Sequence, residues 1–469
     1  DEIPRLRAGG WRIEIAPDFG FSLLEVPIKD WYGDIRDTDD HSSLYDFDLG
    51  IEHEGERISL IPVIAQAIEQ GLTCEALAGM GEGKVLLSLG DGNAPVVCVP
   101  ARQLLPLLRF LDELLDPKAL RKRGGGKIRL DRLRAAQLDG LEGLPIQPPE
   151  SVRILRDRLR DFESLTPVQP PPGLRADLRD YQQQGLTWLQ FLREFGLHGV
   201  LADDMGLGKP LQTLAHLQCE HEAGRSDRPS LIIAPTSVLR NWVSEARRFT
   251  PSLSVLLLHG SERQSDFQHI RSSQLVVTSY PLLIRDLDQL RDQEWHCLIL
   301  DEAQNIKNPR AQATQAACSL NARHRLCLSG TPMENHLGEL WSLFHFLMPG
   351  FLGDRNHFRT TFRNPIEKKG DLDQQHLLAQ RLRPVLLRRT KDTVAKDLPS
   401  KTEILHYIEF PEAQTQLYET IRAAMDKRVR EAISQQGLDR SHIIVLDALL
   451  KLRQVCCHPA LLKQDTAKG

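Results

Sequence analysis

Residues 198–214 read HGVLADDMGLGKPLQTL, and this stretch decides the fold. A short apolar run is followed by a glycine-rich turn and then by a helical pattern. Glycines let the backbone curl so that its N–H groups face a phosphate chain, and the helix N-terminus adds partial positive charge. Lys209 would then reach the β- and γ-phosphates. A plain strand-to-helix turn has the same short pattern, so this stretch alone leaves both interpretations open.

Apolar runs of similar length recur along the following 130 residues or so. They alternate with helical stretches, and near-continuous apolar strands of this kind are typical of a parallel sheet covered by helices on both faces. The predicted fold class is therefore α/β. The predicted strands are HGVLA (198–202), SLIIAP (230–235), SVLLLH (254–259), LVVTS (275–279), CLILDE (297–302) and HRLCLSG (324–330).

Two carboxylates, Asp301 and Glu302, come directly after one of these predicted strands. Ligands of parallel sheets bind at the carboxyl ends of the strands. One carboxylate would bind Mg²⁺, and the other would orient and deprotonate an attacking water. An acidic helix cap would explain Asp301 but not its pairing with the upstream phosphate loop. Ser329 and Thr331 follow the next strand, where a hydroxyl relay could sense the nucleotide.

The order and spacing of the motifs resemble the first motor lobe of the Swi/Snf-type (Snf2-like) DNA translocases of helicase superfamily two, in their bacterial form. The resemblance covers residues 174–469, and the strand-rich N-terminus loosely resembles the accessory region of bacterial members. The matching segments are LRDYQQQGLTWL (178–189), ADDMGLGK (202–209), LIIAPTSVLRNW (231–242), VVTSY (276–280), LILDEAQNIKN (298–308), LSGTPMENHLGELWSLFHFL (328–347), LLRRTKDTVAKDLPSK (386–401) and LLKLRQVCCHPALL (449–462).

The resemblance implies a RecA-like lobe that binds ATP and Mg²⁺ and grips duplex DNA along its backbone. Lys209, Asp301 and Glu302 would be catalytic, with Asp301 as the magnesium ligand. The remaining nucleotide-binding residues implied are Arg179, Gln182 (for the adenine), Gly206, Leu207, Gly208, Pro210 and Leu211. The implied DNA contacts are Thr236, Ser237, Thr278, Ser279, Arg388, Arg389 and Lys391. Such contacts are independent of sequence and sensitive to salt.

Two departures from the family pattern bear on activity. Lys209 is followed by Pro210, where the family has threonine. Proline offers neither the hydroxyl that would bind Mg²⁺ nor the N–H that would bind phosphate, although it suits the first turn of a helix. The family's second motor lobe, with its arginine finger, is expected but is not found in these 469 residues. The predicted activity is therefore that of an ATP hydrolase that is weak or inactive as given.

Four regions are predicted along the chain. A strand-rich accessory domain occupies residues 1–115, with a hairpin turn at Glu54-Gly55-Glu56 and a helix over 102–115. A basic, helical and proline-rich linker follows at 116–173, and its PVQPPPG stretch (167–173) is the clearest boundary. The first motor lobe is predicted at 174–350, and a helical inter-lobe region at 351–469.

Composition excludes several classes of protein. Hydrophobic residues make up 41% and charged residues 26%, which is typical of a globular chain. No run approaches the ~20 apolar residues of a membrane helix, and the eight cysteines include no CxxC pair. These features favour a reduced cytoplasm, with a nucleoid-associated bacterial protein as the expectation. The basic stretches 117–135 and 381–401 could neutralise phosphates or form solvated helix faces.

The sequence leaves three functions open. The first is an ATP-dependent duplex-DNA translocase that remodels protein–DNA complexes. The second is an RNA helicase or an RNA-polymerase-associated remodeller of the same superfamily. The third is a catalytically silent DNA-binding scaffold, which Pro210 favours. The oligomeric state stays open.

Overall fold

The computed structural model describes residues 10–12, 23–25, 30–37, 44–53, 55–81, 83–89, 96–114, 128–138, 146–160, 166–333, 335–394, 405–437 and 441–462. The chain forms two compact units, Asp1–Lys396 and Asp397–Gly469. Glu54 of the predicted hairpin turn lies outside the described residues, as do residues 117–127 and residues 395–401 of the basic stretches. The four predicted regions stay a prediction.

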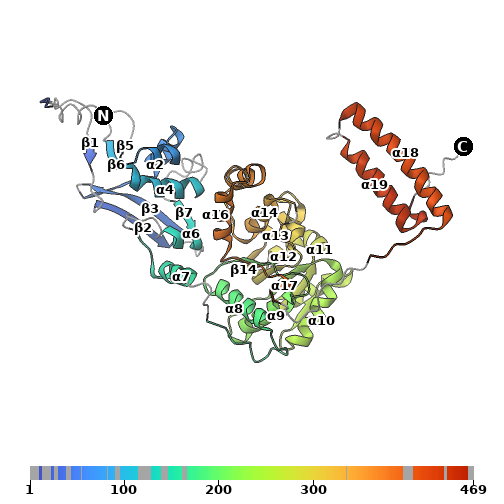
Figure 1. Ribbon diagram of the computed structural model, residues 1–469. Helices are drawn as coiled ribbons and strands as arrows, with labels where there is room; N and C mark the ends of the chain where they lie inside the picture. Colours follow the sequence, from blue (N-terminus) through green and yellow to red (C-terminus); the bar gives the residue numbers. More distant parts are fainter. Residues whose placement is uncertain are drawn as a thin grey trace. The chain divides into compact units, whose positions relative to one another are not determined.

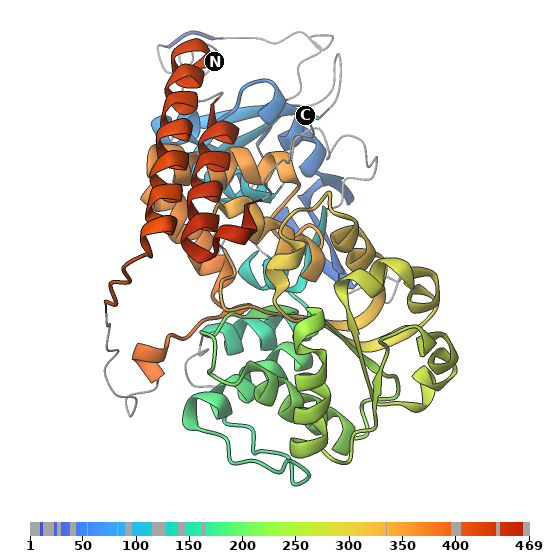
Figure 2. The ribbon, with the colours of Figure 1, turned by 90° about the vertical axis from the view of Figure 1, so that its right-hand side faces the viewer.

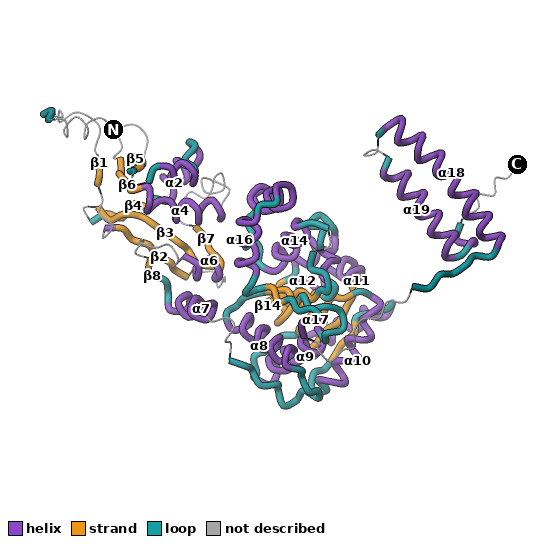
Figure 3. The backbone as a smooth tube through the Cα atoms, viewed as in Figure 1, coloured by secondary structure: helices purple, strands orange, loops and turns teal. Residues whose placement is uncertain are grey.

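A seven-stranded parallel sheet forms the core of the part of the first unit that follows the proline-rich stretch (Figures 1 and 3). Its strand order is β11-β12-β10-β13-β14-β9-β15. The strands are β9 (Gly199–Leu201), β10 (Ser230–Ala234), β11 (Val255–Leu257), β12 (Leu275–Ser279), β13 (Glu294–Leu300), β14 (Asn321–Leu328) and β15 (Leu386–Leu387). The six predicted strands are confirmed. The seventh, β15, is only two residues long and lies beyond the predicted lobe.

Helices cover both faces of this sheet, as predicted. In Figures 1 and 3, α8, α9 and α10 lie on one side of the strands, and α12, α13 and α14 lie on the other. All five residues of β10 and of β12 are buried, which explains their continuous apolar sequence. The helices are α8 (Asp180–Glu194), α9 (Lys209–Glu222), α10 (Leu239–Phe249), α11 (Tyr280–Arg285), α12 (Leu287–Arg291), α13 (Gln312–Ser319) and α14 (Leu337–Leu347).

Shorter elements complete the lobe. The 3₁₀ turns are η4 (Thr236–Val238), η5 (Glu262–Ser272) and η6 (Ala303–Ile306). The segment after α14 contains α15 (Arg355–Phe358), η7 (Arg359–Arg363), η8 (Pro365–Lys369), α16 (Leu372–Leu382) and α17 (Lys391–Val394). The proline-rich stretch is fastened to the lobe, because Val168 N–H donates to Thr187 Oγ1 (3.0 Å) and Gly173 N–H donates to Glu222 Oε1 (2.7 Å).

The N-terminal part of the first unit is strand-rich, as predicted. One sheet has the order β1-β6-β5, and the other has the order β4-β3-β2-β8, with β7 paired to β3. A hairpin joins β3 to β4 through Gly55, whose φ is +86°. The strands are β1 (Leu23–Glu25), β2 (Trp31–Asp37), β3 (Leu44–His53), β4 (Glu56–Ser59), β5 (Lys84–Ser88), β6 (Val96–Pro100), β7 (Ile128–Asp131) and β8 (Ile146–Gln147).

The helices of this part are α2 (Ile61–Glu69), α3 (Cys74–Gly79), α4 (Ala101–Leu114), α6 (Arg132–Gln137) and α7 (Glu150–Arg160). The predicted helix over 102–115 is confirmed as α4. Helix α2 begins with Ile61 and Pro62. Proline suits that first helical turn because its missing N–H has no partner there.

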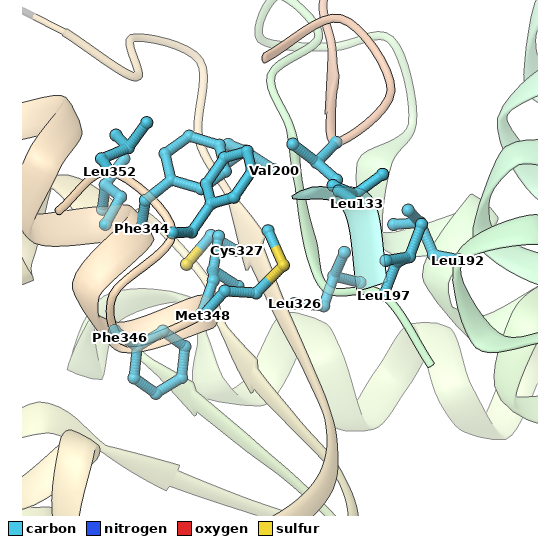
Figure 4. Close-up of a cluster of buried hydrophobic side chains, with 14 of the residues drawn as sticks. Leu133, Leu192, Leu197, Val200, Leu326, Cys327, Phe344, Phe346, Met348 and Leu352 are labelled. Carbon is cyan, nitrogen blue, oxygen red and sulfur yellow. The ribbon is translucent and has the colours of Figure 1, made fainter. Parts of the chain in front are cut away.

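Helix α6 joins the accessory part to the motor lobe. Arg132 Nη1 donates to the carbonyl of Phe195 (2.9 Å), and the buried Arg134 donates to the carbonyl of Phe351. Between them, Leu133 packs with Leu192 and Leu197 in a cluster of buried side chains shared with the lobe (Figure 4). Arg132 and Arg134 of the basic stretch 117–135 therefore bind backbone carbonyls.

The second unit contains a helical hairpin (Figures 1 and 2). Helix α18 (Glu412–Gln436) and helix α19 (His442–Cys457) run antiparallel, since Gln414 near the start of α18 donates to the carbonyl of Val455 near the end of α19 (2.7 Å). The turn η9 (Pro459–Leu461) follows. Across the described parts of both units, no helix combines the length and apolar character needed to span a membrane.

Candidate nucleotide-binding site

The glycine-rich loop lies between β9 and α9, at the carboxyl end of the sheet. Gly206 has φ +87°, and Gly208 has φ +79°, a conformation that side chains with a Cβ rarely adopt. A Cβ on Gly208 would also lie 2.5 Å from Gln182 Nε2. Both glycines are therefore required by the backbone, and the loop ends at the N-terminus of α9 as predicted.

Gln182 links the start of α8 to this loop. Its Oε1 accepts from the backbone N–H of Arg179 (3.0 Å), and its Nε2 donates to the carbonyl of Leu207 (3.2 Å). The Arg179 side chain is exposed beside it. The structure thus brings both residues to the loop, and their contact with an adenine stays a prediction.

Lys209 is the first residue of α9 and is 7% exposed. Its ammonium donates to the carbonyl of Asp203 (2.7 Å), within the loop itself. Burial lowers the pKa of Lys209, while the carboxylates of Glu302 and Asp203 act in the opposite direction. The ammonium therefore lies among acidic groups that it could leave for a phosphate.

Asp301 follows β13, and hydrogen bonds hold both its carboxylate and its backbone. Its Oδ1 accepts from the N–H of Glu302 (3.0 Å), and its Oδ2 accepts from the indole Nε1 of Trp242 (2.8 Å). The Tyr280 hydroxyl donates to its backbone carbonyl (2.8 Å). Burial raises the pKa of Asp301, and the nearby Glu302 carboxylate adds to that effect. The amphipathic helical pattern around Trp242 carries no sign of this contact.

Glu302 begins a chain of hydrogen bonds that joins the ends of β13 and β14. Gln304 Nε2 donates to Glu302 Oε2 (2.9 Å), Ser329 Oγ donates to Gln304 Oε1 (3.0 Å), and Ser329 Oγ accepts from the N–H of Thr331 (3.1 Å). Glu302 itself has φ +49°, the one positive value among the described residues other than glycine. Such a backbone costs roughly 1–2 kcal/mol and is often found at functional sites.

The donor set fits a hard divalent cation. Carboxylate oxygens suit Mg²⁺, and two carboxylates side by side in a largely buried site repel each other unless a cation lies nearby. Pro210 lies in the first turn of α9, as predicted, and supplies neither an N–H nor a hydroxyl. Asp301 would hold the cation beside the Glu302 carboxylate, without a side-chain oxygen from position 210.

Arg389 requires a correction. It is 9% exposed, its Nε donates to Asp203 Oδ1 (2.9 Å), and its Nη2 donates to Gln212 Oε1 (2.7 Å). It also donates to the carbonyl of Tyr181. A guanidinium enclosed in this way cannot reach a DNA phosphate, so the predicted DNA contact of Arg389 is replaced by a buried ion pair beneath the loop.

Thr278 and Ser279 also require a correction. Both are 1% exposed at the end of β12, and the Thr278 hydroxyl donates to the carbonyl of Leu258 (3.2 Å). Their side chains are therefore not available to DNA. Thr236, Ser237 and Arg388 are exposed, which a DNA contact requires. Lys391 is exposed as well, but it lies beside the phosphate loop.

A parallel α/β sheet with a glycine-rich loop leading into a helix, a lysine at that helix start and paired carboxylates after β13, one strand removed from β9, defines a RecA-like nucleotide-binding lobe of the P-loop class. Comparison with protein families narrows the class, since residues 181–461 match the model described as the SNF2-related domain. The chain belongs to this family.

Curated relatives agree with that assignment. The chain is 39% identical over 361 residues to the "Putative ATP-dependent helicase/translocase YwqA" of Bacillus subtilis, covering 76% of this chain and 38% of that protein. It is 39% identical over 319 residues to "Helicase swr1" of Schizosaccharomyces pombe, covering 63% of this chain and 24% of that protein. It is 36% identical over 360 residues to "TATA-binding protein-associated factor mot1" of Aspergillus fumigatus, covering 70% of this chain and 19% of that protein.

Among solved structures, the chain is similar to the "Sulfolobus solfataricus SWI2/SNF2 ATPase core in complex with dsDNA". The identity is 37% and the TM-score 0.47, over 64% of this chain and 62% of that chain. The chain thus spans well under half the length of the curated relatives it matches.

Proposed function

We propose that this chain carries the ATP-binding motor lobe of a DNA-dependent ATPase that moves along duplex DNA and remodels protein–DNA complexes. The observation that carries the proposal is the convergence of Lys209, Asp301, Glu302 and the Gln304–Ser329 pair at one edge of the sheet. Membership of the SNF2-related family and the name of the Bacillus subtilis relative, an ATP-dependent helicase/translocase, support it.

The residues have distinct roles in this proposal. Lys209 leaves the Asp203 carbonyl and binds the β- and γ-phosphates of ATP. Asp301, fixed by Trp242, holds Mg²⁺, which when bound would neutralise phosphate charge. Glu302 orients the attacking water and accepts its proton. The hydrogen bonds from Glu302 through Gln304 to Ser329 then link the site to the loop after β14.

For DNA, the proposal rests on exposed groups near the carboxyl end of the sheet. Thr236 and Ser237 follow β10 in η4, and Arg388 follows β15. Hydroxyls and guanidinium groups bind backbone phosphates without reading bases. We therefore expect binding that is insensitive to sequence and weakens steeply as salt rises.

Two alternatives differ in substrate or in activity. An RNA helicase or RNA-polymerase-associated remodeller would use the same nucleotide site on another polymer. A catalytically silent DNA-binding scaffold is favoured by one observation, Pro210 in the first turn of α9. Turnover in this family is expected to need a second motor lobe with an arginine finger, so the activity of a whole protein is part of the proposal.

One assay separates these functions. ATP turnover is measured with no polymer, duplex DNA, single-stranded DNA and RNA, on this chain and on a version that includes a second motor lobe. We expect stimulation by duplex DNA in the longer version only, and loss of that stimulation with Lys209→Ala. Stimulation by RNA alone would favour the helicase alternative. DNA binding without turnover in either version would favour the scaffold.

A further inference from the structure

The segment after α16 runs along the phosphate loop. Strand β15 pairs in parallel with β9, and the N–H of Ala202 donates to the carbonyl of Leu387 (2.7 Å). The contact continues past the strand, because the N–H of Asp204 donates to the carbonyl of Arg389 (3.0 Å). The Asp204 carboxylate then accepts from the N–H of Lys391 (3.0 Å). Asp204 thus fixes the backbone of this segment at two points.

These contacts place the Lys391 side chain against the loop. Its Cε and Nζ each lie 3.6 Å from the position that a Cβ on Gly206 would occupy. Gly206 has φ +87° and belongs to the stretch whose N–H groups would face a phosphate. Lys209 lies on the inner side of the same loop, where its ammonium is buried. Two ammonium groups therefore flank the loop.

The two ammonium groups differ in their partners. Lys209 donates to the carbonyl of Asp203, whereas the Lys391 ammonium has no hydrogen-bond or ion-pair partner within the described segments. Lys391 is also exposed, so its charge stays hydrated until a ligand arrives. An ammonium on a flexible four-carbon stem is a strong point-charge ligand for phosphate.

We propose that Lys391 is a second phosphate-binding cation of this site, which contacts the terminal phosphates of a bound nucleoside triphosphate from the segment that leads into the second unit. The inference rests on the proposed function, because it needs a nucleotide in the loop. Lys391 would also compensate for Pro210, because proline lacks the N–H that would bind a phosphate and the hydroxyl that would bind Mg²⁺. Lys391 was predicted to bind DNA, and its place beside Gly206 favours the nucleotide instead.

The test is calorimetric titration of Mg·ATP and of AMP into the 469-residue chain and three variants, without DNA. Lys391→Met removes the charge and keeps the length of the side chain. Lys368→Met makes the same change at an exposed lysine of η8. Lys209→Ala tests whether Mg·ATP binds through the phosphate loop. Thermal melts of all four proteins check that each is folded, and a duplex-DNA titration of Lys391→Met is run alongside.

We expect Lys391→Met to weaken Mg·ATP binding about ten-fold, as for the loss of one charge-assisted hydrogen bond, with AMP affinity unchanged. Lys368→Met should bind both nucleotides as the unaltered chain does. If Lys209→Ala weakens Mg·ATP binding but Lys391→Met does not, the inference about Lys391 is wrong and the proposed function survives. If Lys391→Met then also weakens the binding of duplex DNA, Lys391 is a DNA contact, as the sequence predicted. Absence of Mg·ATP binding by the unaltered chain would overturn both.

Discussion

Trp242 has a role in the structure that its sequence context does not indicate. Its indole N–H donates to Asp301 Oδ2 at 2.8 Å, although the side chain is 2% exposed and packs in the core. A buried donor bound to a carboxylate orients that carboxylate as well as satisfying itself. Trp242 therefore positions the proposed magnesium ligand from helix α10.

Replacing Trp242 with Phe should weaken Mg²⁺-dependent nucleotide binding about ten-fold, because partners of metal ligands typically contribute that much. Trp295→Phe is the matched control, since Trp295 is equally buried but donates to the carbonyl of Leu290. Both variants should lose about 1–3 kcal/mol of stability. The measurement is binding of a fluorescent ATP analogue as a function of Mg²⁺ concentration. Equal Mg²⁺ dependence in the two variants would show that Trp242 is only a core residue.

Pro210 gives a second prediction at the residue scale. Threonine there would supply a hydroxyl ligand for Mg²⁺ and a backbone N–H for a phosphate, and the hydrogen bond from that N–H to a charged group contributes roughly 1.5–3 kcal/mol. Pro210→Thr should therefore tighten Mg·ATP binding by at least about ten-fold, with little change in the thermal melt, because both residues suit a first helical turn. Calorimetric titration of Mg·ATP into the unaltered chain and into Pro210→Thr measures the difference in affinity. Unchanged affinity would mean that the loop already compensates for proline.

The place of a residue could be predicted from the sequence where it depends on neighbours in the chain. Lys209 starts the helix after β9, and Asp301 and Glu302 follow β13, so their meeting at one sheet edge followed from the topology, while their roles stay predictions. Arg389 and Thr278 could not be placed in that way. Arg389 binds Asp203, which is 186 residues earlier, and nothing in RRTK distinguishes the buried arginine from the exposed one.

At the scale of elements, strand β15 explains why Arg389 is buried. A two-residue strand on β9 places Arg389 under the phosphate loop, where it contacts Tyr181 of α8, Asp203 and Gln212 of α9. Through these contacts, Arg389 joins the segment after β15 to α8 and α9, the two helices beside the nucleotide site.

Arg389→Gln should destabilise the first unit by about 3–5 kcal/mol, because it leaves the buried Asp203 carboxylate without its cation. Arg388→Gln changes the exposed neighbour and should leave the melting temperature unchanged. Thermal denaturation of the two variants measures this difference. Similar melting temperatures would mean that the ion pair contributes nothing net to stability.

A group of histidines on α9, on β14 and just before β9 predicts sensitivity to acid. Burial lowers the pKa of His216 to about 4, and it lowers the pKa values of His198 and His324 to about 3. The unfolded chain takes up these protons near pH 6.5, whereas the folded chain resists them. Their stabilising contribution is therefore complete above pH 6.5 and is lost as the pH falls toward 4.

For His216 alone, the loss should be about 1.4 kcal/mol per pH unit below 6.5. Denaturant titrations at pH 7.5, 6.0 and 5.0 measure it. The variant His324→Phe keeps a ring that can pack against His296, at a centroid distance of 5.4 Å in the native pair, and removes one titrating group. Its stability should fall less steeply with pH. An identical slope would show that His324 does not take part.

For the whole molecule, periodicity was enough to predict the parallel sheet, since both of its faces are covered and most residues of its strands are apolar. The way the accessory part is attached was not predictable. Arg132, Leu133 and Arg134 join it to the lobe through contacts with Phe195, Leu197 and Phe351, which are distant in sequence. From the sequence, Arg132 and Arg134 could have bound phosphates or formed a solvated helix face, and only the fold shows that they bind carbonyls.

The central claim is that the loop at 202–210 and the carboxylates after β13 form a working site for Mg·ATP. Its most direct test is calorimetric titration of Mg·ATP into the chain and into Lys209→Ala, with thermal melts to confirm that both are folded. The account predicts saturable binding by the chain and a loss of about a hundred-fold in affinity with Lys209→Ala. Equal affinities in the two proteins, or no binding by the unaltered chain, would contradict it.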